Sequence, residues 1–326
     1  MRLVPFLSLV LFVSAPLSAA DAKWLHASSA HFELYAAQSG SDIRAALQYL
    51  EDVRAFFLNA THSQDPGGQP ARIVVFETEG DFTKYRPPEY GAVSVYSMAG
   101  APATIVSLGL KPENYEKIFR EYCQLVLDQS APKMRYWLRD GLAQFYSTLK
   151  PEGDKIKLGA APAREFHTHD GLNVNLVEVF NADRRLFLES RSRPSTEFYA
   201  DTGSYAALGA RGAAQTQAMN ALETKASLDY ELPSWGLTHM IMFSSLYRAK
   251  AGEFIGLLSN GQETVTTFGS VYGRSLSEVR SDLTLYMRQA GLAVATIAFK
   301  PEKIPAPAMK PASKEEVEAL LAPAGK

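Results

Sequence analysis

The hydrophobic pattern of the chain changes near residue 110, and this change limits the folds that the sequence can adopt. Before it, apolar and β-branched stretches predict strands at 31–36, 72–76, 90–96 and 104–108, with helices at 42–59 and 82–85. After it, periodic apolar positions predict helices at 112–129, 134–149, 234–250, 252–259 and 276–289, with a short strand at 155–158. We therefore expect an α+β fold in which an N-terminal mixed sheet with helices is followed by a mostly helical second half.

The first 20 residues have the pattern of a secretory signal peptide. Met1 and Arg2 give a short positive start, an apolar run covers 3–13, and residues 18–20 fit a small-x-small cleavage site. The run is too short for a membrane-spanning helix, which needs about 20 apolar residues. We expect an exported protein, periplasmic or secreted, that has no transmembrane anchor.

The rest of the chain is expected to form one domain and a tail. The domain covers 21–295, with a strand-rich part at 21–112 and a helical part at 113–295. Prolines at 301, 305, 307 and 311 predict that the remaining segment, 296–326, is a semi-rigid Pro-rich tail from about residue 299 onward. Near its end, Ser313 is a plausible N-cap to Glu316 in a short amphipathic helix.

Charge and cysteine content narrow the class of function. The chain has 33 Lys and Arg against 35 Asp and Glu, a formal net charge of −2, and no basic block. Nucleic acid is therefore not an expected partner. The single cysteine, Cys123, cannot form an intramolecular disulfide, and its helical spacing predicts a buried, inert thiol. His239 lies in an apolar stretch and is expected to be a core histidine whose ring is hydrogen-bonded.

Two predicted helices, 112–129 and 134–149, carry the residues on which the functional interpretation depends. The first contains Arg120, Glu121 and Gln124, and the second contains Asp140. Taken alone, the three polar residues of the first helix fit the solvated face of an ordinary amphipathic helix. The motif in the second helix favours a different interpretation.

The sequence resembles the secreted bacterial peptidase-MA-like proteins, a gluzincin family with the zincin fold. In that family, a helix reading His-Glu-Tyr-x-His precedes a Pro-containing turn and a helix reading Trp-Leu-x-Glu-Gly-Leu-Ala-Glu-x-Tyr-Ser. The matching residues in this chain are Glu121, Tyr122, Pro132, Trp137, Leu138, Gly141, Leu142, Ala143, Tyr146 and Ser147. The resemblance covers most of 24–290, except 160–230. It implies a zincin-like fold in which two histidines and a carboxylate of the next helix hold zinc, and the Glu of the first motif activates water.

The metal-ligand positions implied by this resemblance are substituted. Arg120 and Gln124 stand at the histidine positions and Asp140 at the third, whereas Glu121 keeps the general-base position. An arginine has no lone pair for a metal, and a glutamine carbonyl is a weak neutral donor. We therefore expect no zinc and no other cofactor. Glu121 is then expected to be inactive. Without zinc, the pKa of the attacking water stays at about 15.7 instead of falling to about 7.

The substitutions also suggest what replaces the metal. We expect the guanidinium of Arg120 to occupy the space of the missing cation and to pair with Asp140, with Glu121 as a further candidate partner. Such a pair would join the two helices through hydrogen bonds and charge.

These expectations favour an exported, non-catalytic peptidase-like protein, or pseudoenzyme. It would bind or scaffold a peptide or protein in the former active-site cleft, with 104–108 as the sheet edge that receives it. The alternative is an active metal-dependent peptidase or hydrolase with an atypical site, for which His167 and His169 are candidate ligands. A third reading is a structural accessory protein whose Pro-rich tail docks to a partner. The oligomeric state is not indicated by the sequence.

Overall fold

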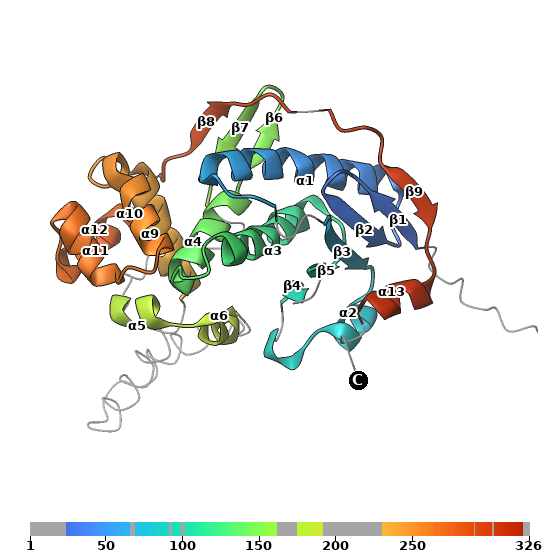
Figure 1. Ribbon diagram of the computed structural model, residues 1–326, viewed down its shortest axis with the longest axis horizontal. Coiled ribbons are helices and arrows are strands. Elements are labelled where there is room, and N and C mark those ends of the chain that lie inside the picture. Colours follow the sequence, from blue (N-terminus) through green and yellow to red (C-terminus); the bar gives the residue numbers. More distant parts are fainter. Residues whose placement is uncertain are drawn as a thin grey trace, which may run out of the picture.

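The computed structural model describes residues 24–65, 69–90, 93–98, 102–161, 175–191, 230–289, 291–301 and 303–321. These residues form a mixed sheet, a second small sheet and many helices, so the expected α+β class is confirmed (Figure 1). The predicted signal peptide and both His167 and His169 lie outside these ranges. Within them, no helix combines the length and the apolar character that a membrane span requires.

A six-stranded mixed sheet forms one half of the structure. Its strands follow the order β4 (Val95–Met98), β5 (Thr104–Leu108), β3 (Ala71–Phe76), β2 (Phe32–Ala36), β1 (Leu25–Ser28) and β9 (Ala308–Pro311). The central pairs β5–β3 and β3–β2 are parallel, and the other three pairs are antiparallel. The expectation that 104–108 is the sheet edge is wrong, because β4 pairs with its outer side and forms the edge instead.

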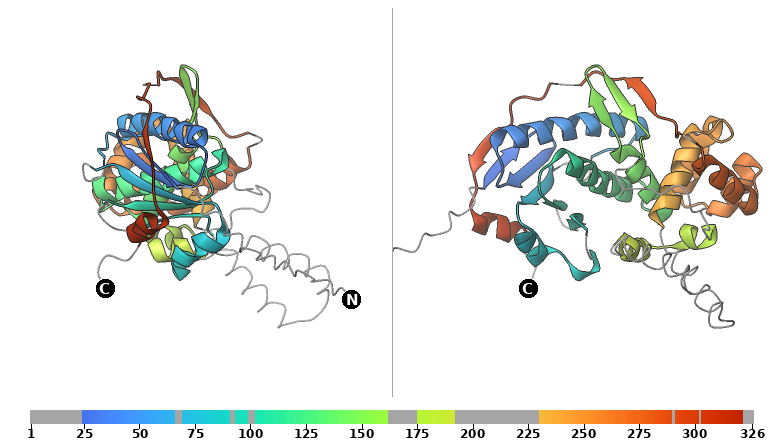
Figure 2. Two further views of the ribbon diagram at one scale, coloured as in Figure 1. Left: turned by 90° about the vertical axis from the view of Figure 1, so that its right-hand side faces the viewer. Right: turned by 180° about the vertical axis from the view of Figure 1, so that it is seen from behind.

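Helices cover both faces of this sheet, as the two further views in Figure 2 show. The crossover helix α1 (Gly40–Thr61) and α3 (Pro112–Ser130) pack on one face, and α2 (Glu79–Tyr85) and α13 (Lys314–Leu321) on the other. Alternate residues of β3 divide between the two sides. Ile73 and Val75 join the larger core, while Val74 and Phe76 join the smaller one. This alternation follows from the two-residue period of a strand.

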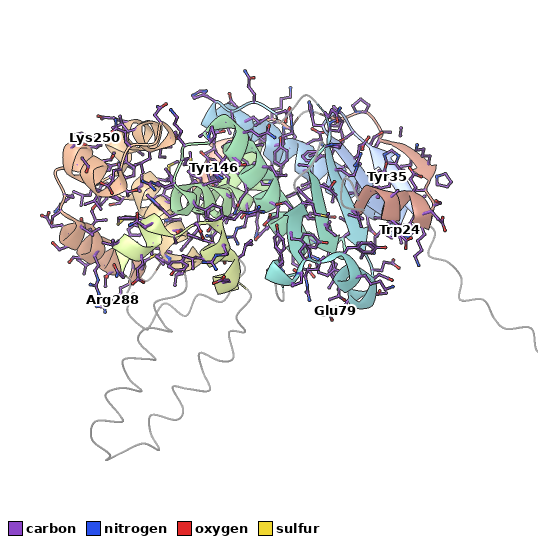
Figure 3. The ribbon with its side chains drawn as sticks, turned by 60° about the horizontal axis from the view of Figure 1, so that its bottom comes forward. Trp24, Tyr35, Glu79, Tyr146, Lys250 and Arg288 are labelled. Carbon is purple, nitrogen blue, oxygen red and sulfur yellow. The ribbon has the colours of Figure 1, made fainter. Side chains whose placement is uncertain are left out.

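The second half of the structure is mostly helical, as expected. Its elements are α4 (Tyr136–Ser147), α5 (Leu176–Asn181), α6 (Arg184–Arg191), α9 (Glu231–Phe243), η2 (Arg248–Lys250), α10 (Ala251–Ser259), α11 (Thr264–Tyr272) and α12 (Leu276–Met287). The predicted single helix at 234–250 is two elements, because Ser244 adopts an extended conformation that ends α9. Tyr146 of α4 lies between the end carrying Trp24 and Tyr35 and the end carrying Lys250 and Arg288 (Figure 3).

The segment expected to be a semi-rigid tail takes part in both sheets. β8 (Ala295–Ala298) pairs with β7 (Lys155–Leu158), which pairs with β6 (Lys150–Glu152), and β9 adds to the main sheet beside β1. The linker expectation is therefore wrong for β9, whereas the short helix expected near Ser313 is confirmed as α13. Val317 and Leu321 of α13 are buried in the smaller core. The capping prediction is confirmed, because the amide of Glu316 donates to Ser313 Oγ at 3.1 Å.

Candidate functional site

The two motif helices and α9 meet in the centre of the structure, and a glycine allows their close packing. α4 lies between α3 and α9 and contacts both extensively. A Cβ atom added at Gly141 of α4 would overlap Thr238 Oγ1 and the backbone oxygen of Ser234, both in α9. The requirement here is space, since Gly141 lies inside a regular helix. The sequence motif therefore includes the residue that lets α9 approach the site.

Arg120 lies at this junction and contacts two carboxylates. Its Nη2 atom donates to Asp140 Oδ1 at 2.7 Å and to Glu231 Oε1 at 2.7 Å. Asp140 is fully buried, Glu231 nearly so, and the Arg120 side chain is 18% exposed. The predicted pairing of Arg120 with Asp140 is confirmed. Glu231, at the start of α9, was not identified from the sequence.

Two glutamines complete the hydrogen bonding of Asp140. Gln124 Nε2 donates to Asp140 Oδ1 at 2.8 Å, while Gln124 Oε1 accepts from the Tyr136 hydroxyl at 2.9 Å. Gln144 Nε2 donates to Asp140 Oδ2 at 2.7 Å and to the backbone oxygen of Glu231 at 3.1 Å. Both carboxylate oxygens of Asp140 are thus engaged by donors from α3 and α4. A buried carboxylate with a cation and two amides around it is stabilised without a metal.

Glu121 faces the sheet edge. Its carboxylate is buried and accepts a hydrogen bond from Ser97 Oγ of β4 at 2.8 Å. The Tyr90 hydroxyl donates to the backbone oxygen of Ser97 at 2.8 Å. The retained general-base position is therefore connected to the edge strand β4.

Helix α6 lies over this edge. Arg184 Nη2 donates to the Tyr90 hydroxyl at 2.9 Å. Partial burial lowers the pKa of Arg184, but nearby Tyr90, Tyr136 and Glu121 raise it, and the net pKa is above its usual value. Phe187 packs against Tyr136 with ring centroids 4.8 Å apart. The first turn of α6 thus links β4 to the start of α4.

The residues at the implied ligand positions do not fit a zinc ion. The guanidinium of Arg120 has no lone pair, and the amide nitrogen of Gln124 points at Asp140, whose oxygens already accept three hydrogen bonds. Zinc requires several donors that converge on an open position. Within the described ranges, no group of three His, Cys, Asp or Glu side chains is arranged to hold a metal ion.

Cys123 and His239 are core residues, as predicted. Burial raises the pKa of the Cys123 thiol well above its usual value, which disfavours a thiolate. His239 Nε2 lies 2.8 Å and 3.1 Å from the backbone oxygens of Gly159 and Ala293, so it carries a hydrogen. Nδ1 then accepts from the Tyr286 hydroxyl at 2.7 Å.

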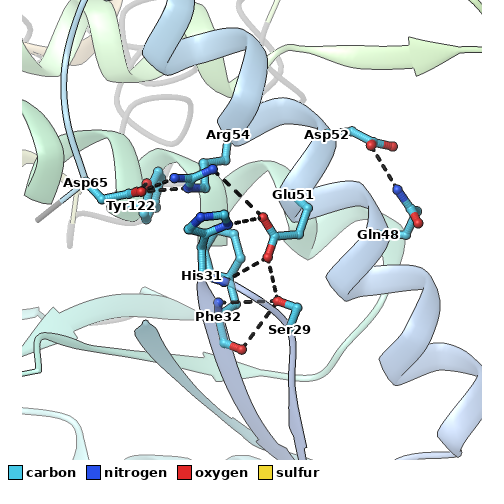
Figure 4. A network of polar contacts seen from close by, with 9 residues as sticks. All are labelled: Ser29, His31, Phe32, Gln48, Glu51, Asp52, Arg54, Asp65 and Tyr122. Carbon is cyan, nitrogen blue, oxygen red and sulfur yellow. Dashed lines mark hydrogen bonds and ion pairs between the residues drawn. The ribbon is translucent and has the colours of Figure 1, made fainter. Parts of the chain in front are cut away.

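A second polar network anchors the other face of α3 (Figure 4). Glu51 of α1 is buried and accepts from Ser29 Oγ at 2.6 Å and from the backbone amide of His31 at 3.0 Å. The Tyr122 hydroxyl donates to Asp65 Oδ1 at 2.6 Å, and Arg54 pairs with the same carboxylate. These bonds connect α1, the turn before β2 and α3. They position the helix that carries Arg120 and Glu121.

Comparison with known proteins adds no relative. No protein family model matches the chain, and a search of curated proteins gives no match.

Proposed function

We propose that this protein is an exported, non-catalytic relative of zinc peptidases that binds an extended peptide beside α3 and the edge strand β4. The proposal combines the motif resemblance with the contacts of the site. Its main support is the position of Arg120, whose guanidinium joins Asp140 and Glu231 at a motif position where a peptidase would place a metal ligand. A cation fixed to the protein supplies the charge that holds the helices together, without an activated water.

The chemistry of Arg120 and Gln124 argues against hydrolysis by the zinc-peptidase route, because a guanidinium cannot ligate a metal and a carboxamide is a weak donor. Glu121 is held by Ser97, and general acid–base catalysis alone contributes only about 10²–10⁴-fold. Zinc-dependent hydrolysis also needs the lowered pKa of a metal-bound water. We therefore assign Glu121 a role in holding the edge strand rather than in chemistry.

The edge of β4 carries backbone groups that a peptide strand could pair with, but Val95 and Ser97 are buried, so a bound strand must displace what covers them. The amide of Leu108 donates to the backbone oxygen of Ser94. In an antiparallel pair, hydrogen-bonded and non-hydrogen-bonded residue pairs alternate, so this bond fixes which residues of β4 bond to β5. In this register, Val95 and Ser97 direct their backbone groups away from β5. Addition of a strand to such an edge is a common mode of peptide recognition. The Tyr90 hydroxyl already occupies the oxygen of Ser97, so it competes with a bound strand.

The test measures binding and cleavage with the same probe. Fluorescently labelled peptides from a casein digest are incubated with the purified chain, with and without a chelator. We expect binding by fluorescence anisotropy and no turnover under either condition. Tyr90→Phe should strengthen binding because it frees the oxygen of Ser97, whereas the control Tyr115→Phe should leave binding unchanged. Chelator-sensitive cleavage, or no binding by any peptide, would overturn the proposal.

A further inference from the structure

A groove of about 660 Å³ lies next to the candidate site, and its walls are rich in cations. It runs between the turn before α4 and the turn that joins α5 to α6. The charged residues that line it are Lys133, Arg135, Arg139, Asp183 and Arg184. Four cations thus face one acid, in a chain whose formal net charge is −2. The cationic excess is a local feature of this groove.

Some of these charges already have partners. Arg139 pairs with Asp128, and Arg184 donates to the Tyr90 hydroxyl. Asp183 Oδ1 accepts from the backbone amide of Leu186, so the one acid of the lining serves as a helix cap. The surplus charge therefore rests mainly on Lys133 and Arg135.

Lys133 and Arg135 are exposed, and among the described residues neither forms an ion pair. The positive charge of Arg135 acts on Glu263, whose carboxylate accepts hydrogen bonds from the amides of Val265 and Thr266 at the start of α11. Arg135 is also the N-cap of α4 and makes no side-chain capping bond. The positive end of the α4 dipole therefore adds to the charge of the two side chains.

The groove is connected to the proposed peptide site by two of its lining residues. Tyr136 donates to Gln124 inside the Asp140 network, and Arg184 donates to Tyr90, which in turn holds the edge strand. A peptide lying along β4 would therefore meet the cations when it extends past α6 toward α4.

We propose that this groove binds acidic side chains of the peptide, so that the protein selects acidic peptide segments. This inference rests on the proposed function. A peptide suits the groove better than a small anion, because Lys133 and Arg135 are both exposed, and exposed cations hold a single small anion only weakly in water. Such cations favour acidic over neutral peptides because their positive charge attracts the acidic side chains.

The test uses three labelled twelve-residue peptides with identical apolar positions and with four Glu, four Gln or four Lys at the remaining charged sites. Anisotropy is measured with the full chain at low and at physiological salt. We expect the Glu peptide to bind about 10-fold more tightly than the Gln peptide at low salt and to lose most of this preference at physiological salt. Lys133→Gln combined with Arg135→Gln should reduce binding of the Glu peptide to the level of the Gln peptide. Binding of the Gln peptide itself should not change.

A matched control removes two exposed cations elsewhere, as Lys155→Gln with Lys303→Gln, and should keep the preference for the Glu peptide. Equal binding of the Glu and Gln peptides would overturn the acidic preference while leaving the proposed function intact. Binding of none of the three would count against both. Displacement of the Glu peptide by micromolar inorganic phosphate would show a small-anion site and would also overturn the inference.

Discussion

Arg120 Nη2 lies 2.7 Å from Asp140 Oδ1 and 2.7 Å from Glu231 Oε1, so one guanidinium joins α3, α4 and α9. Both carboxylates are buried. Removing them from water is costly unless a cation and hydrogen bonds compensate. The arrangement therefore makes the fold of the site depend on a single side chain.

Replacing this side chain should destabilise the protein strongly. Arg120→Ala leaves two buried carboxylates without their cation, and breaking a buried pair in this way costs roughly 3–5 kcal/mol. Urea unfolding followed by circular dichroism measures the loss. Arg185→Ala is the control, because Arg185 and its partner Glu189 are both exposed, and losing this pair should cost about 1 kcal/mol or less. Equal costs for the two variants would contradict the role of Arg120.

The close contact of α4 with α9 gives a second prediction. Gly141→Ala should destabilise by about 1–3 kcal/mol, since the new methyl group overlaps the backbone of Ser234 and cannot be relieved by a rotamer change. Helix propensity alone predicts the opposite, a gain of up to about 1 kcal/mol. Gly256→Ala in α10, where a Cβ meets nothing within 4 Å, is the control and should be neutral or stabilising. A loss of unfolding free energy in Gly141→Ala would support the close contact of α4 with α9, and a gain would contradict it.

His239 should make stability depend on pH. Burial lowers the pKa of His239, against the effect of the backbone oxygens of Gly159 and Ala293. In the unfolded chain the pKa of His239 is about 6.5, so the unfolded state binds a proton more readily than the folded one. Stability is therefore full above about pH 6.5 and falls as pH decreases below it. Unfolding free energies at several pH values should show this slope, and His239→Gln should reduce it; the part that remains comes from His26, whose pKa is also lowered by burial.

The exposed His62 provides the control for that experiment. His62→Asn keeps a residue that tolerates the left-handed backbone found there and should retain the full pH slope. If the His239 variant keeps the slope and the His62 variant loses it, the buried ring is not the source.

The tail helix α13 should contribute to stability as a core element. Leu321→Ala removes a side chain that is 3% exposed and should cost roughly 2–5 kcal/mol. Leu285→Ala, at a position 66% exposed in α12, should be close to neutral. A free linker would make both variants equally harmless, and thermal denaturation distinguishes the two results.

Local patterns predicted many elements, but they missed β1 and α11, placed β4 too early at 90–96, and did not show which elements are neighbours. The run at 104–108 has clear strand chemistry and forms β5 with those bounds. Its place inside the sheet depends on β4, whose pairing is a tertiary contact that no local signal shows. β9 contains only Ala308–Pro311 and is a strand because β1 offers a partner across 280 residues of sequence.

The same limit applies to the site. Arg120, Gln124 and Asp140 were found because they stand at fixed helical spacings within a recognisable motif. Glu231 is separated from Arg120 by 111 positions and looks like an ordinary acid in the first turn of a helix. Ser97 likewise lies in a strand without any motif, although it holds Glu121. Distance along the chain concealed Glu231, and the lack of a motif concealed Ser97.

Zinc content tests the replacement of the metal by Arg120 most directly. The wild-type chain is purified without added metal, dialysed against micromolar zinc and measured by elemental analysis, alongside the triple variant Arg120→His, Gln124→His, Asp140→Glu. We predict below about 0.1 zinc per chain for the wild type and close to one for the variant, which would then have three convergent donors. One tightly held zinc per wild-type chain, lost on substitution of Asp140, would contradict the account.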